Sequence, residues 1–336
     1  MLIVKTPFRM SFVGGGTDVA NYYEKYGGAV LSTTFDKYCY HTIRYYPPFF
    51  KHIGRATYSQ IEEFDSPDEI KHPIIREVLR KFGVSNIHVM YDADLPARSG
   101  LGTSSAFSVG LLNGIHSLRG EFIDKMSLAK EAIYLERVLC KEAGGVQDQL
   151  ACSFGGLNKI SFSADGFDVT PVIMPVARKQ LLSDSLMLFF TGFVRFSSKI
   201  MAEQISNTSK KLEQLHQMVK LVDEGLEILT RGTELNEFGR LLDYTWKLKR
   251  SLAGGISNDT LDEIYSTAQK AGAIGGKVLG AGGGGFILFF VEPEKQPNIL
   301  QALKNLRHVP FEFETGGTKV IYYKDETESG GKIQWQ

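Results

Sequence analysis

The segment PARSGLGTSSAFSVGLL, residues 96–112, combines two glycines, three consecutive hydroxyl residues and an apolar run at helical spacing. Gly100 and Gly102 allow close backbone approach, and residues 103–105 stand where the N-cap of a helix is expected. Unpaired N–H groups and the positive dipole end of such a helix favour an anion. The hydroxyl row also suits a magnesium ion that bridges phosphates. For this segment alone, a phosphate cradle and an ordinary capped helix are equally good interpretations.

Two carboxylates further along the chain could complete such a site. A helical projection of residues 127–140 places Glu136 beside the apolar face, where a carboxylate requires a partner, a metal or a raised pKa. Asp148 lies in a short apolar segment between two glutamines. Taken singly, Glu136 could be a carboxylate at the rim of the apolar face, and Asp148 could be the N-cap of a helix. Together with the glycine loop they fit phosphoryl transfer, with one carboxylate on Mg²⁺ and the other accepting a hydroxyl proton.

Two other glycine patterns fail their structural tests. A P-loop requires GxxxxGK[ST], but Gly276–Lys277 is followed by valine and lacks the first glycine, so that loop is excluded. Residues 280–285 match GxGxxG, yet FILFF at 286–290 predicts a strand, whereas a dinucleotide-binding fingerprint opens a helix. Five glycines in six residues exceed what a tight turn needs, which favours a role in the site.

The composition is typical of a soluble globular protein. The 336 residues suffice for two domains, and Lys plus Arg balance Asp plus Glu at 38 each, so we predict neither a nucleic-acid nor a membrane partner. Cys39, Cys140 and Cys152 lack zinc-site spacing and are expected to be buried thiols in a reducing compartment. No signal peptide or membrane span is evident in the sequence, which favours a cytoplasmic protein.

Strands and helices mix irregularly in both halves, so the sequence predicts the α+β class and not a doubly wound sheet. Expected strands are 3–4, 10–13, 30–46, 86–92, two within 155–173, 186–191 and 286–291. Expected helices are 72–82, one behind the opening loop, 127–140, a long stretch over 197–250 broken near Gly232, and 259–270. A composition shift near 175–183 predicts domains 1–178 and 179–325 and a tail, 326–336, that is expected to fray.

Three segments in register resemble the GHMP kinases, a superfamily that includes galactokinase, homoserine kinase and mevalonate kinase. They are RMSFVGGGTD at 9–18, PARSGLGTSSA at 96–106 and KVLGAGGGGF at 277–286. The resemblance spans nearly the whole chain. It implies an N-terminal ribosomal-protein-like α+β domain and a C-terminal ferredoxin-like domain. It also implies an active site between them that uses ATP and Mg²⁺ on a small-molecule substrate.

The same resemblance implies roles for individual residues. The second motif would wrap the phosphates of ATP through Pro96, Gly100, Leu101, Gly102, Thr103, Ser104 and Ser105. Mg²⁺ would be held by Ser104 and Glu136. Asp148 would be the general base, and Arg9 would stabilise the transferring phosphoryl group. Substrate contacts would come from Gly15, Gly16, Thr17 and Asp18 of the first motif and from Gly282, Gly283 and Gly284 of the third.

Within the superfamily, GGGTD at 14–18 departs from the galactokinase pattern. This motif, residues 191–200 and residues 246–257 look instead like the D-glycero-D-manno-heptose 7-phosphate kinases and, more distantly, like bacterial fucokinase domains. The former resemblance implies phosphorylation of the anomeric hydroxyl of a sugar that already carries a phosphate, which serves nucleotide-heptose and surface-glycan synthesis. A second phosphate needs further cations. The candidates are Arg195, Lys199, Lys249 and Arg250, although a solvated helix face explains each of them equally well.

Three alternatives stay open at this point. One is another sugar-1-kinase, acting on free fucose or galactose. The second is a decarboxylase like the diphosphomevalonate enzymes, which the sugar-type first motif disfavours. The third is a non-catalytic ligand-binding protein, which the intact set of Ser104, Glu136 and Asp148 disfavours. A monomer and a homodimer are equally consistent with the sequence.

Overall fold

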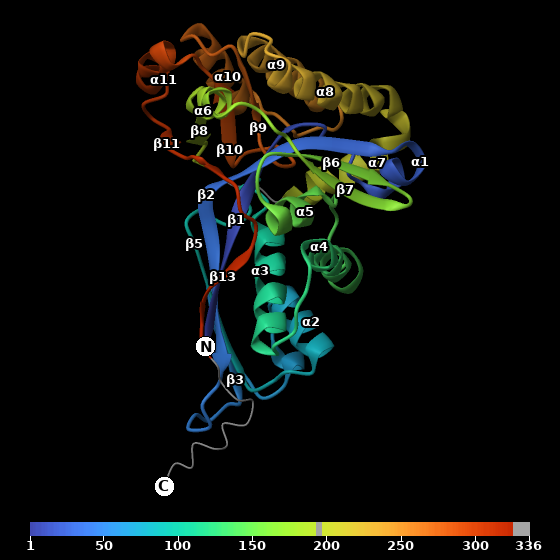
Figure 1. Ribbon diagram of the computed structural model, residues 1–336, viewed down its shortest axis with the longest axis vertical. Coiled ribbons are helices and arrows are strands. Elements are labelled where there is room, and N and C mark those ends of the chain that lie inside the picture. Colours follow the sequence, from blue (N-terminus) through green and yellow to red (C-terminus); the bar gives the residue numbers. More distant parts are fainter. Residues whose placement is uncertain (193–196, 325–336) are drawn as a thin grey trace.

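The computed structural model describes residues 1–192 and 197–324, and two sheets organise them (Figure 1). The larger sheet has the order β13-β1-β2-β5-β3-β4, with β12 and β6 also pairing with β2, and β7 with β6. Its strands are β1 (Leu2–Val13), β2 (Gly28–Tyr45), β3 (Gly54–Thr57), β4 (Ile61–Phe64), β5 (Ile87–Ala93), β6 (Asn158–Ser163), β7 (Gly166–Pro171), β12 (Phe313–Glu314) and β13 (Lys319–Tyr323). Within the described range, only β3 and β5 pair in parallel.

Strand β1 is one continuous element where the sequence predicts two. Pro7 cannot donate a ladder hydrogen bond, and the register of β1 against β2 shifts between Pro7 and Phe8. Valine, isoleucine and phenylalanine dominate the rest of the strand, which favours extended structure on both sides of this irregularity. The same strand therefore carries Arg9 in the middle of the sheet and Phe12 near its end.

The helices of the first half lie on one side of this sheet (Figure 1). They are α1 (Ala20–Tyr26), α2 (Pro73–Phe82), α3 (Thr103–Leu118), α4 (Lys125–Tyr134) and α5 (Gln147–Phe154), with a π turn over Leu135–Leu139. Helix α3 packs on β1 and β2. Its side chains Phe107, Leu111 and Ile115 are buried, which confirms the predicted helical spacing.

The second sheet consists of β8 (Leu186–Phe190), β9 (Gly275–Val278), β10 (Phe286–Phe290) and β11 (Arg307–Val309). Its order, β11-β8-β10-β9, is antiparallel throughout and is the strand order of a ferredoxin-like unit, as the family resemblance implies. Helices of this half are α6 (Val176–Asp184), α7 (Ser197–Asn207), α8 (Leu212–Thr230), α9 (Asn236–Arg250), α10 (Asp259–Lys270) and α11 (Gln296–Ala302). Three short 3₁₀ turns occupy Pro67–Glu69, Thr208–Lys210 and Pro293–Lys295.

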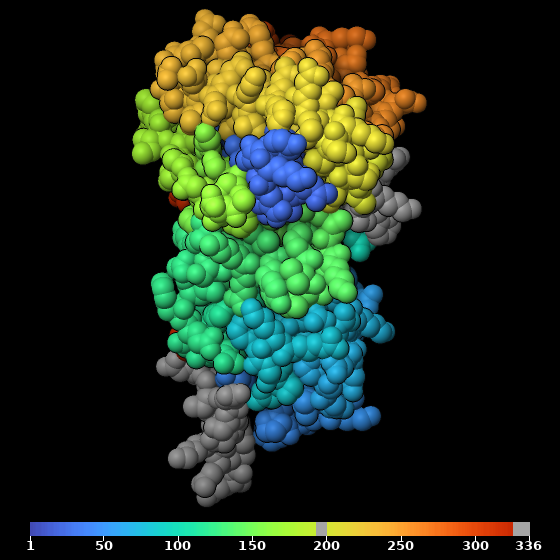
Figure 2. Space-filling view, turned by 90° about the vertical axis from the view of Figure 1, so that its right-hand side faces the viewer, coloured from blue at the N-terminus to red at the C-terminus, as the bar shows by residue number. Residues whose placement is uncertain are grey.

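The two halves are packed against each other through aromatic residues. The ring of Phe12 on β1 meets that of Phe238 on α9 edge to face, with centroids 5.4 Å apart. The hydroxyl of Tyr22 on α1 lies 2.7 Å from Nδ1 of His216 on α8. Figure 2 shows the blue surface of α1 lying against the yellow surface of the C-terminal half. This packing fixes the two motif-bearing halves relative to one another.

The α+β prediction is confirmed, and helix α10 has the predicted bounds. The stretch 197–250 breaks near Gly232 as predicted, but also at the 3₁₀ turn Thr208–Lys210. Strands β3 and β4 were not expected, because their four residues are too short for a periodic signal. Cys39 and Cys152 are buried free thiols as predicted, whereas Cys140 is half-buried.

The last strands correct the second predicted domain. β12 and β13, within residues 313–323, pair with β2 and β1 of the larger sheet and not with the ferredoxin-like sheet. Hydrophobic pattern cannot reveal this return, since it fixes a strand but not its partner. The boundary at 178/179 stays a prediction. The tail 326–336 lies outside the described residues. Among residues 1–192 and 197–324, no helix is long and apolar enough to span a bilayer.

Candidate active site

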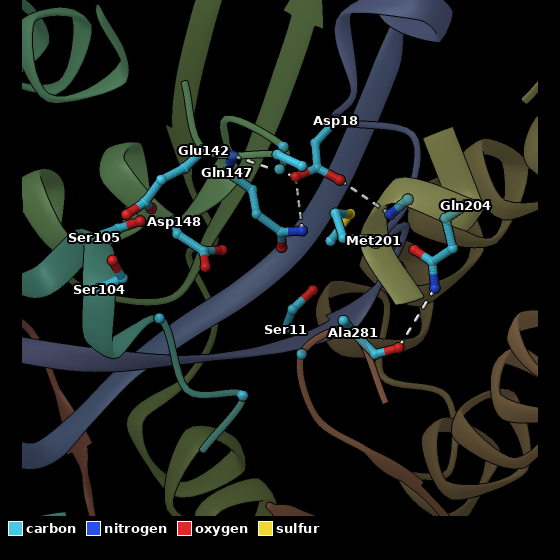
Figure 3. Close-up of a pocket in the computed structure, with 18 of the residues that line it drawn as sticks. Ser11, Asp18, Ser104, Ser105, Glu142, Gln147, Asp148, Met201, Gln204 and Ala281 are labelled. Carbon is cyan, nitrogen blue, oxygen red and sulfur yellow. Dashed lines mark hydrogen bonds between the residues drawn. The ribbon is translucent and has the colours of Figure 1, made fainter. Parts of the chain in front are cut away.

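A cavity of about 690 Å³ lies where the two halves meet. Its wall is formed by the first motif, the N-terminal end of α3, the π turn with the loop that follows it, the start of α5, and helices α7 and α9 with the third glycine motif. Figure 3 shows Ser104, Ser105 and Asp148 on one side of this cavity and Met201, Gln204 and Ala281 on the other. Gln204 Nε2 donates to the carbonyl of Ala281 at 3.4 Å, so the last two are tied together.

The N-terminal end of α3 forms one wall through its backbone. The N-cap is Gly102, at φ 72° and without a side-chain cap, so Thr103, Ser104 and Ser105 occupy the first turn and not the cap position we expected. Because no side chain caps the helix, its first N–H groups and dipole face the cavity, which suits an anion. Gly100 has a φ of 83°, and a Cβ there would lie 2.5 Å from the carbonyl of Leu279. Only glycine allows the second and third motifs to approach this closely.

Two predicted members of the phosphate loop do not line the cavity. Pro96 is exposed on the approach to the loop. Leu101 is fully buried in the core and contributes its carbonyl to the N–H of Arg9 at 3.0 Å. Both residues therefore have structural roles, because Pro96 starts the loop and Leu101 anchors it to β1.

Arg9 and Asp148 form a bidentate ion pair in the cavity. Arg9 Nε donates to Oδ1 at 2.7 Å, and Nη2 donates to Oδ2 at 2.6 Å. The remaining nitrogen, Nη1, donates to the carbonyl of Gly100 at 2.7 Å. Burial lowers the pKa of the Arg9 guanidinium, but the attraction of Asp148 outweighs this and raises the pKa. A Cβ on Gly102 would lie 3.5 Å from Asp148 Oδ2, so the carboxylate lies directly beside the phosphate loop.

Glu136 reaches the cavity from the π turn and is 1% exposed. Its Oε2 accepts hydrogen bonds from Gln149 at 2.9 Å, Ser105 at 3.2 Å and Arg137 at 3.3 Å. Its Oε1 is buried without a hydrogen-bond partner. Burial raises the pKa of Glu136 to about 7, against the opposing charge of Arg137. An orphaned, inward-facing carboxylate oxygen next to the hydroxyl row is a vacant acceptor for a hard cation.

Gly15, Gly16 and Asp18 of the first motif line the cavity, and their contacts with a substrate stay a prediction. Asp18 accepts from the N–H of Gly16 at 3.0 Å and from Gln147 Nε2 at 2.9 Å (Figure 3). Thr17 is a correction, because it is fully buried and donates its hydroxyl to the carbonyl of Gly14 at 2.8 Å. It fixes the turn of the motif and does not face the cavity.

The third motif lines the cavity with Gly280 and Ala281 and not with the predicted Gly282, Gly283 and Gly284. A Cβ at Gly282 would lie 2.6 Å from the carbonyl of Ile256, so this glycine serves close packing against the backbone behind the loop. Its φ of 98° also requires glycine. Residues 282–284 therefore allow the close packing that holds the end of β9 beside the phosphate loop.

The four cations proposed for a distal phosphate have different positions. Arg195 lies outside the described residues, and the side chain of Lys199 is not described. Arg250 is a correction, since it pairs with Asp262 and does not line the cavity. Lys249 does line it and is 5% exposed. Successive helix residues point about 100° apart, so α9 turns Lys249 inward and Arg250 outward.

Sequence reasoning missed several residues of the wall, namely Ser11, Arg98, Arg137, Glu142, Gln147, Met201, Gln204 and Lys277. Ser11 and Lys277 lie inside two of the quoted motifs, which could have drawn attention to them. Lys277 is 1% exposed and donates to the carbonyl of Phe12 at 2.8 Å. A charged residue inside an apolar strand is a usable signal for a functional site.

Two family models match the chain. The GHMP kinases N terminal domain matches residues 70–156, and the GHMP kinases C terminal model matches residues 226–307. A D-glycero-alpha-D-manno-heptose 7-phosphate kinase of Campylobacter jejuni is 30% identical, over 89% of this chain and 92% of that relative. An L-fucokinase/L-fucose-1-P guanylyltransferase of Bacteroides fragilis is 31% identical, over 68% of this chain but 24% of that relative.

A solved structure resembles the whole chain. It is a D-glycero-D-manno-heptose 1-phosphate kinase from Bacteriodes thetaiotaomicron, with a TM-score of 0.79, 25% identity, and coverage of 97% of this chain and 100% of the other. The three motifs, the two-part fold and a relative matched over nearly its full length agree with one another. The protein is a phosphotransferase with ATP as the donor that its family uses. The chain belongs to the GHMP kinases.

Proposed function

We propose that the protein transfers the γ-phosphoryl group of ATP to the anomeric hydroxyl of a sugar phosphate. The substrate is D-glycero-D-manno-heptose 7-phosphate, which becomes the 1,7-bisphosphate used for nucleotide-heptose and surface-glycan synthesis. The observation that carries the kinase chemistry is the Asp148 carboxylate, held by Arg9 beside the uncapped end of α3. The heptose 7-phosphate kinase at 30% identity over most of both chains supports the choice of sugar.

In this reaction the end of α3 binds the phosphates of ATP, and Asp148 orients the acceptor hydroxyl. As the hydroxyl oxygen bonds to the γ-phosphorus, its proton passes to a carboxylate oxygen of Asp148. The bond from the γ-phosphorus to the β,γ-bridging oxygen breaks, and ADP leaves. Arg9 keeps the carboxylate in place through two hydrogen bonds. Positioning and electrostatics supply most of the rate in such transfers.

Glu136 and Ser104 fit a magnesium ion. Glu136 offers the buried Oε1 that has no protein donor, and Ser104 is an exposed hydroxyl residue in the cavity wall. Mg²⁺ in kinases commonly takes one or two carboxylates and completes its shell with substrate phosphates and water. When bound, the ion would neutralise phosphate charge.

The free sugar hydroxyls have natural partners in the first motif. Asp18 holds a carboxylate between the N–H of Gly16 and the amide of Gln147, and it is 3% exposed at the cavity wall. A carboxylate with remaining lone pairs accepts hydroxyl hydrogen bonds well. We assign sugar recognition to Asp18 and to the backbone of Gly15 and Gly16.

A fucokinase-like activity on an unphosphorylated sugar is the second candidate. It is favoured by the 31% identity to the kinase-bearing relative of Bacteroides fragilis. The deciding experiment measures ADP release from ATP and Mg²⁺ with five acceptors: heptose 7-phosphate, heptose 1-phosphate, the free heptose, L-fucose and mevalonate. Turnover confined to heptose 7-phosphate supports the proposal. Preference for a free sugar, for heptose 1-phosphate or for mevalonate overturns the choice of substrate. If none of the five acceptors is phosphorylated, the proposal that the protein is a kinase for one of them is overturned.

A further inference from the structure

Two lysines in the cavity wall are buried without a carboxylate partner. Lys249 on α9 and Lys277 on β9 are 5% and 1% exposed. Lys249 Nζ donates to the carbonyl of Gly280, and Lys277 Nζ donates to the carbonyl of Phe12 at 2.8 Å. Within the part of the chain that the structure describes, no carboxylate lies within 4.0 Å of either ammonium group, whereas Arg9 has Asp148. Burying an ammonium group without a counter-ion is costly, so a ligand that brings its own negative charge is indicated.

The position of Lys249 shows which part of a ligand it can meet. Its acceptor Gly280 packs directly on Gly100, because a Cβ at Gly280 would collide with the Cα of Gly100. Gly100 in turn accepts a hydrogen bond from Arg9, which holds Asp148. A continuous set of contacts therefore runs from the carboxylate, through the phosphate loop, to Lys249. The ammonium group lies beside the loop where a phosphoryl group would pass to the acceptor.

Arg9 is less available for binding the transferring phosphoryl group than the sequence suggests. Each of its three guanidinium nitrogens already makes a hydrogen bond, two to Asp148 and one to Gly100. Lys249 donates one hydrogen bond to Gly280, which leaves N–H donors of its ammonium group for a ligand. Arg9 keeps one further N–H on each of Nη1 and Nη2, but its charge is paired with Asp148, so we treat it as a positioning residue for that carboxylate. The positive charge without a carboxylate partner belongs to the two lysines.

We propose that Lys249, assisted by Lys277, is a catalytic residue that binds the γ-phosphoryl group of ATP during its transfer to the acceptor. This inference rests on the proposed kinase function and adds a residue to its machinery. During transfer, the acceptor proton goes to Asp148, the oxygen–phosphorus bond forms, and ADP leaves with the electrons of the broken bond. Lys249 keeps its own proton and stabilises the charge on the phosphoryl oxygens.

The electrostatics of the cavity agree with a cation that functions near neutral pH. Burial lowers the pKa of Lys249 to about 8, with Arg9 adding to the shift and Asp18 and Asp148 opposing it. Lys277 also faces this group, and burial lowers its own pKa well below the usual value. Lys249 is charged at pH 7, and an arriving phosphoryl group strengthens its hold on the proton.

The test compares Lys249→Met with Arg250→Met, its outward neighbour on the same helix. For Lys249→Met we expect kcat to fall about a hundredfold, as for loss of one charge-stabilising donor. The KM for the sugar should stay within threefold. Arg250→Met should keep near-wild-type kcat. Lys249→Arg should restore part of the rate and move the alkaline fall of kcat to higher pH, which a merely structural side chain would not do.

A second readout needs no sugar. Calorimetry measures the affinity for ADP and for AMP-PNP, which carries a third phosphoryl group. The proteins compared are wild type, Lys249→Met and Arg250→Met. We expect unchanged ADP affinity and at least a fivefold loss, in Lys249→Met alone, of the preference for AMP-PNP. An unchanged preference together with an unchanged kcat would overturn the proposal, as would an effect confined to the KM of the sugar phosphate. A wild type that binds AMP-PNP but turns over no acceptor would instead count against the proposed function.

Discussion

The two charged walls of the cavity are built in opposite ways. The phosphate wall, residues 100–105, is one contiguous segment that acts through glycine backbone and a helix end. The cationic wall, defined as Arg9, Lys249 and Lys277, takes one residue each from β1, α9 and β9. The first wall can be recognised in sequence because its residues are neighbours. The second becomes visible only when three segments far apart in the chain, at residues 9, 249 and 277, are folded together.

The walls also differ in what holds them. The phosphate wall depends on close backbone contact, so changes to its glycines strain the fold itself. The cationic wall depends on single side chains that are buried at an energetic cost, and of these only Arg9 has a carboxylate partner within the described residues. Substitutions in the first wall should therefore lower stability and activity together, whereas substitutions in the second should separate them.

The largest effect is expected where the two walls meet, at Asp148. Asp148→Asn removes the proton acceptor but keeps the size and a hydrogen-bond acceptor for Arg9. We expect kcat to fall by roughly 10²–10⁴ with little change in ATP affinity. Steady-state kinetics and nucleotide titration measure the two effects, with Asp165→Asn in the exposed turn between β6 and β7 as the control. Retention of full turnover would remove Asp148 from the role of base.

Gly100→Ala tests the backbone wall. At a φ of 83° a Cβ would meet the carbonyl of Leu279 at 2.5 Å, so strain and collision add. We expect the free energy of unfolding to fall by roughly 2–3 kcal/mol, together with weaker ATP binding. Gly83→Ala is the matched control, because it has a φ of 63° but no atom within 4 Å. It should cost roughly 1 kcal/mol from backbone strain alone. Equal losses in chemical denaturation would contradict the close-contact explanation.

Glu136→Gln tests the metal assignment beside the phosphate wall, where Glu136 accepts a hydrogen bond from Ser105. Burial raises the pKa of Glu136 to about 7, so the proton competes with Mg²⁺ below that pH. Wild-type Mg²⁺ affinity should rise with pH up to about 7 and then level off, while the Gln variant binds at least about tenfold more weakly and without this dependence.

The same residue affects the stability of the metal-free protein. The folded pKa of Glu136 lies above the 4.5 of an ordinary glutamate, so its stabilising contribution is present below pH 4.5 and is lost as pH rises through 7. Denaturation at several pH values should show this loss in wild type and not in Glu136→Gln. An identical pH profile in both proteins would place the titration elsewhere.

The smallest effect concerns stability on the cationic wall. The folded pKa of Lys249, about 8, lies below its ordinary 10.5, so the unfolded chain binds this proton more tightly. The residue therefore costs stability below pH 8, and this cost is relieved as pH rises from 8 to 10.5. Lys249→Met should stabilise the ligand-free protein by about 1 kcal/mol at pH 7 while impairing catalysis. A destabilised variant would show that the aliphatic stem or the Gly280 contact matters more than the charge.

Local pattern was enough for much of the fold and for half of the site. The extended segment of β2, the spacing of Phe107, Leu111 and Ile115, and the bounds of α10 follow from residue types and periodicity, which neighbouring residues determine. The inward position of Glu136 also followed from helical projection and is confirmed by its 1% exposure. Such patterns do not determine which helices and strands pack against one another.

The errors have that same origin. Thr17 and Leu101 belong to motifs, yet they hold the loops from behind and face away from the cavity. The choice between Lys249 and Arg250, adjacent on one helix, depended on how α9 is rotated against β9. The spacing of Leu242 and Trp246 does place Lys249 on the apolar face of the helix and Arg250 about 100° away from it, but only the fold shows that this face meets the cavity.

The sequence by itself determined the α+β class, the three glycine-bearing motifs, the two carboxylates and, through them, the kind of chemistry. Tertiary structure alone decided that Arg9 is bound to Asp148, that β12 and β13 return to the first sheet, and that two lysines without a carboxylate partner line the same cavity as the phosphate loop. The physical reason is the range of the interactions. Periodicity, turn conformation and helix dipoles act between neighbours in the chain, whereas burial and charge pairing depend on which distant segments come into contact.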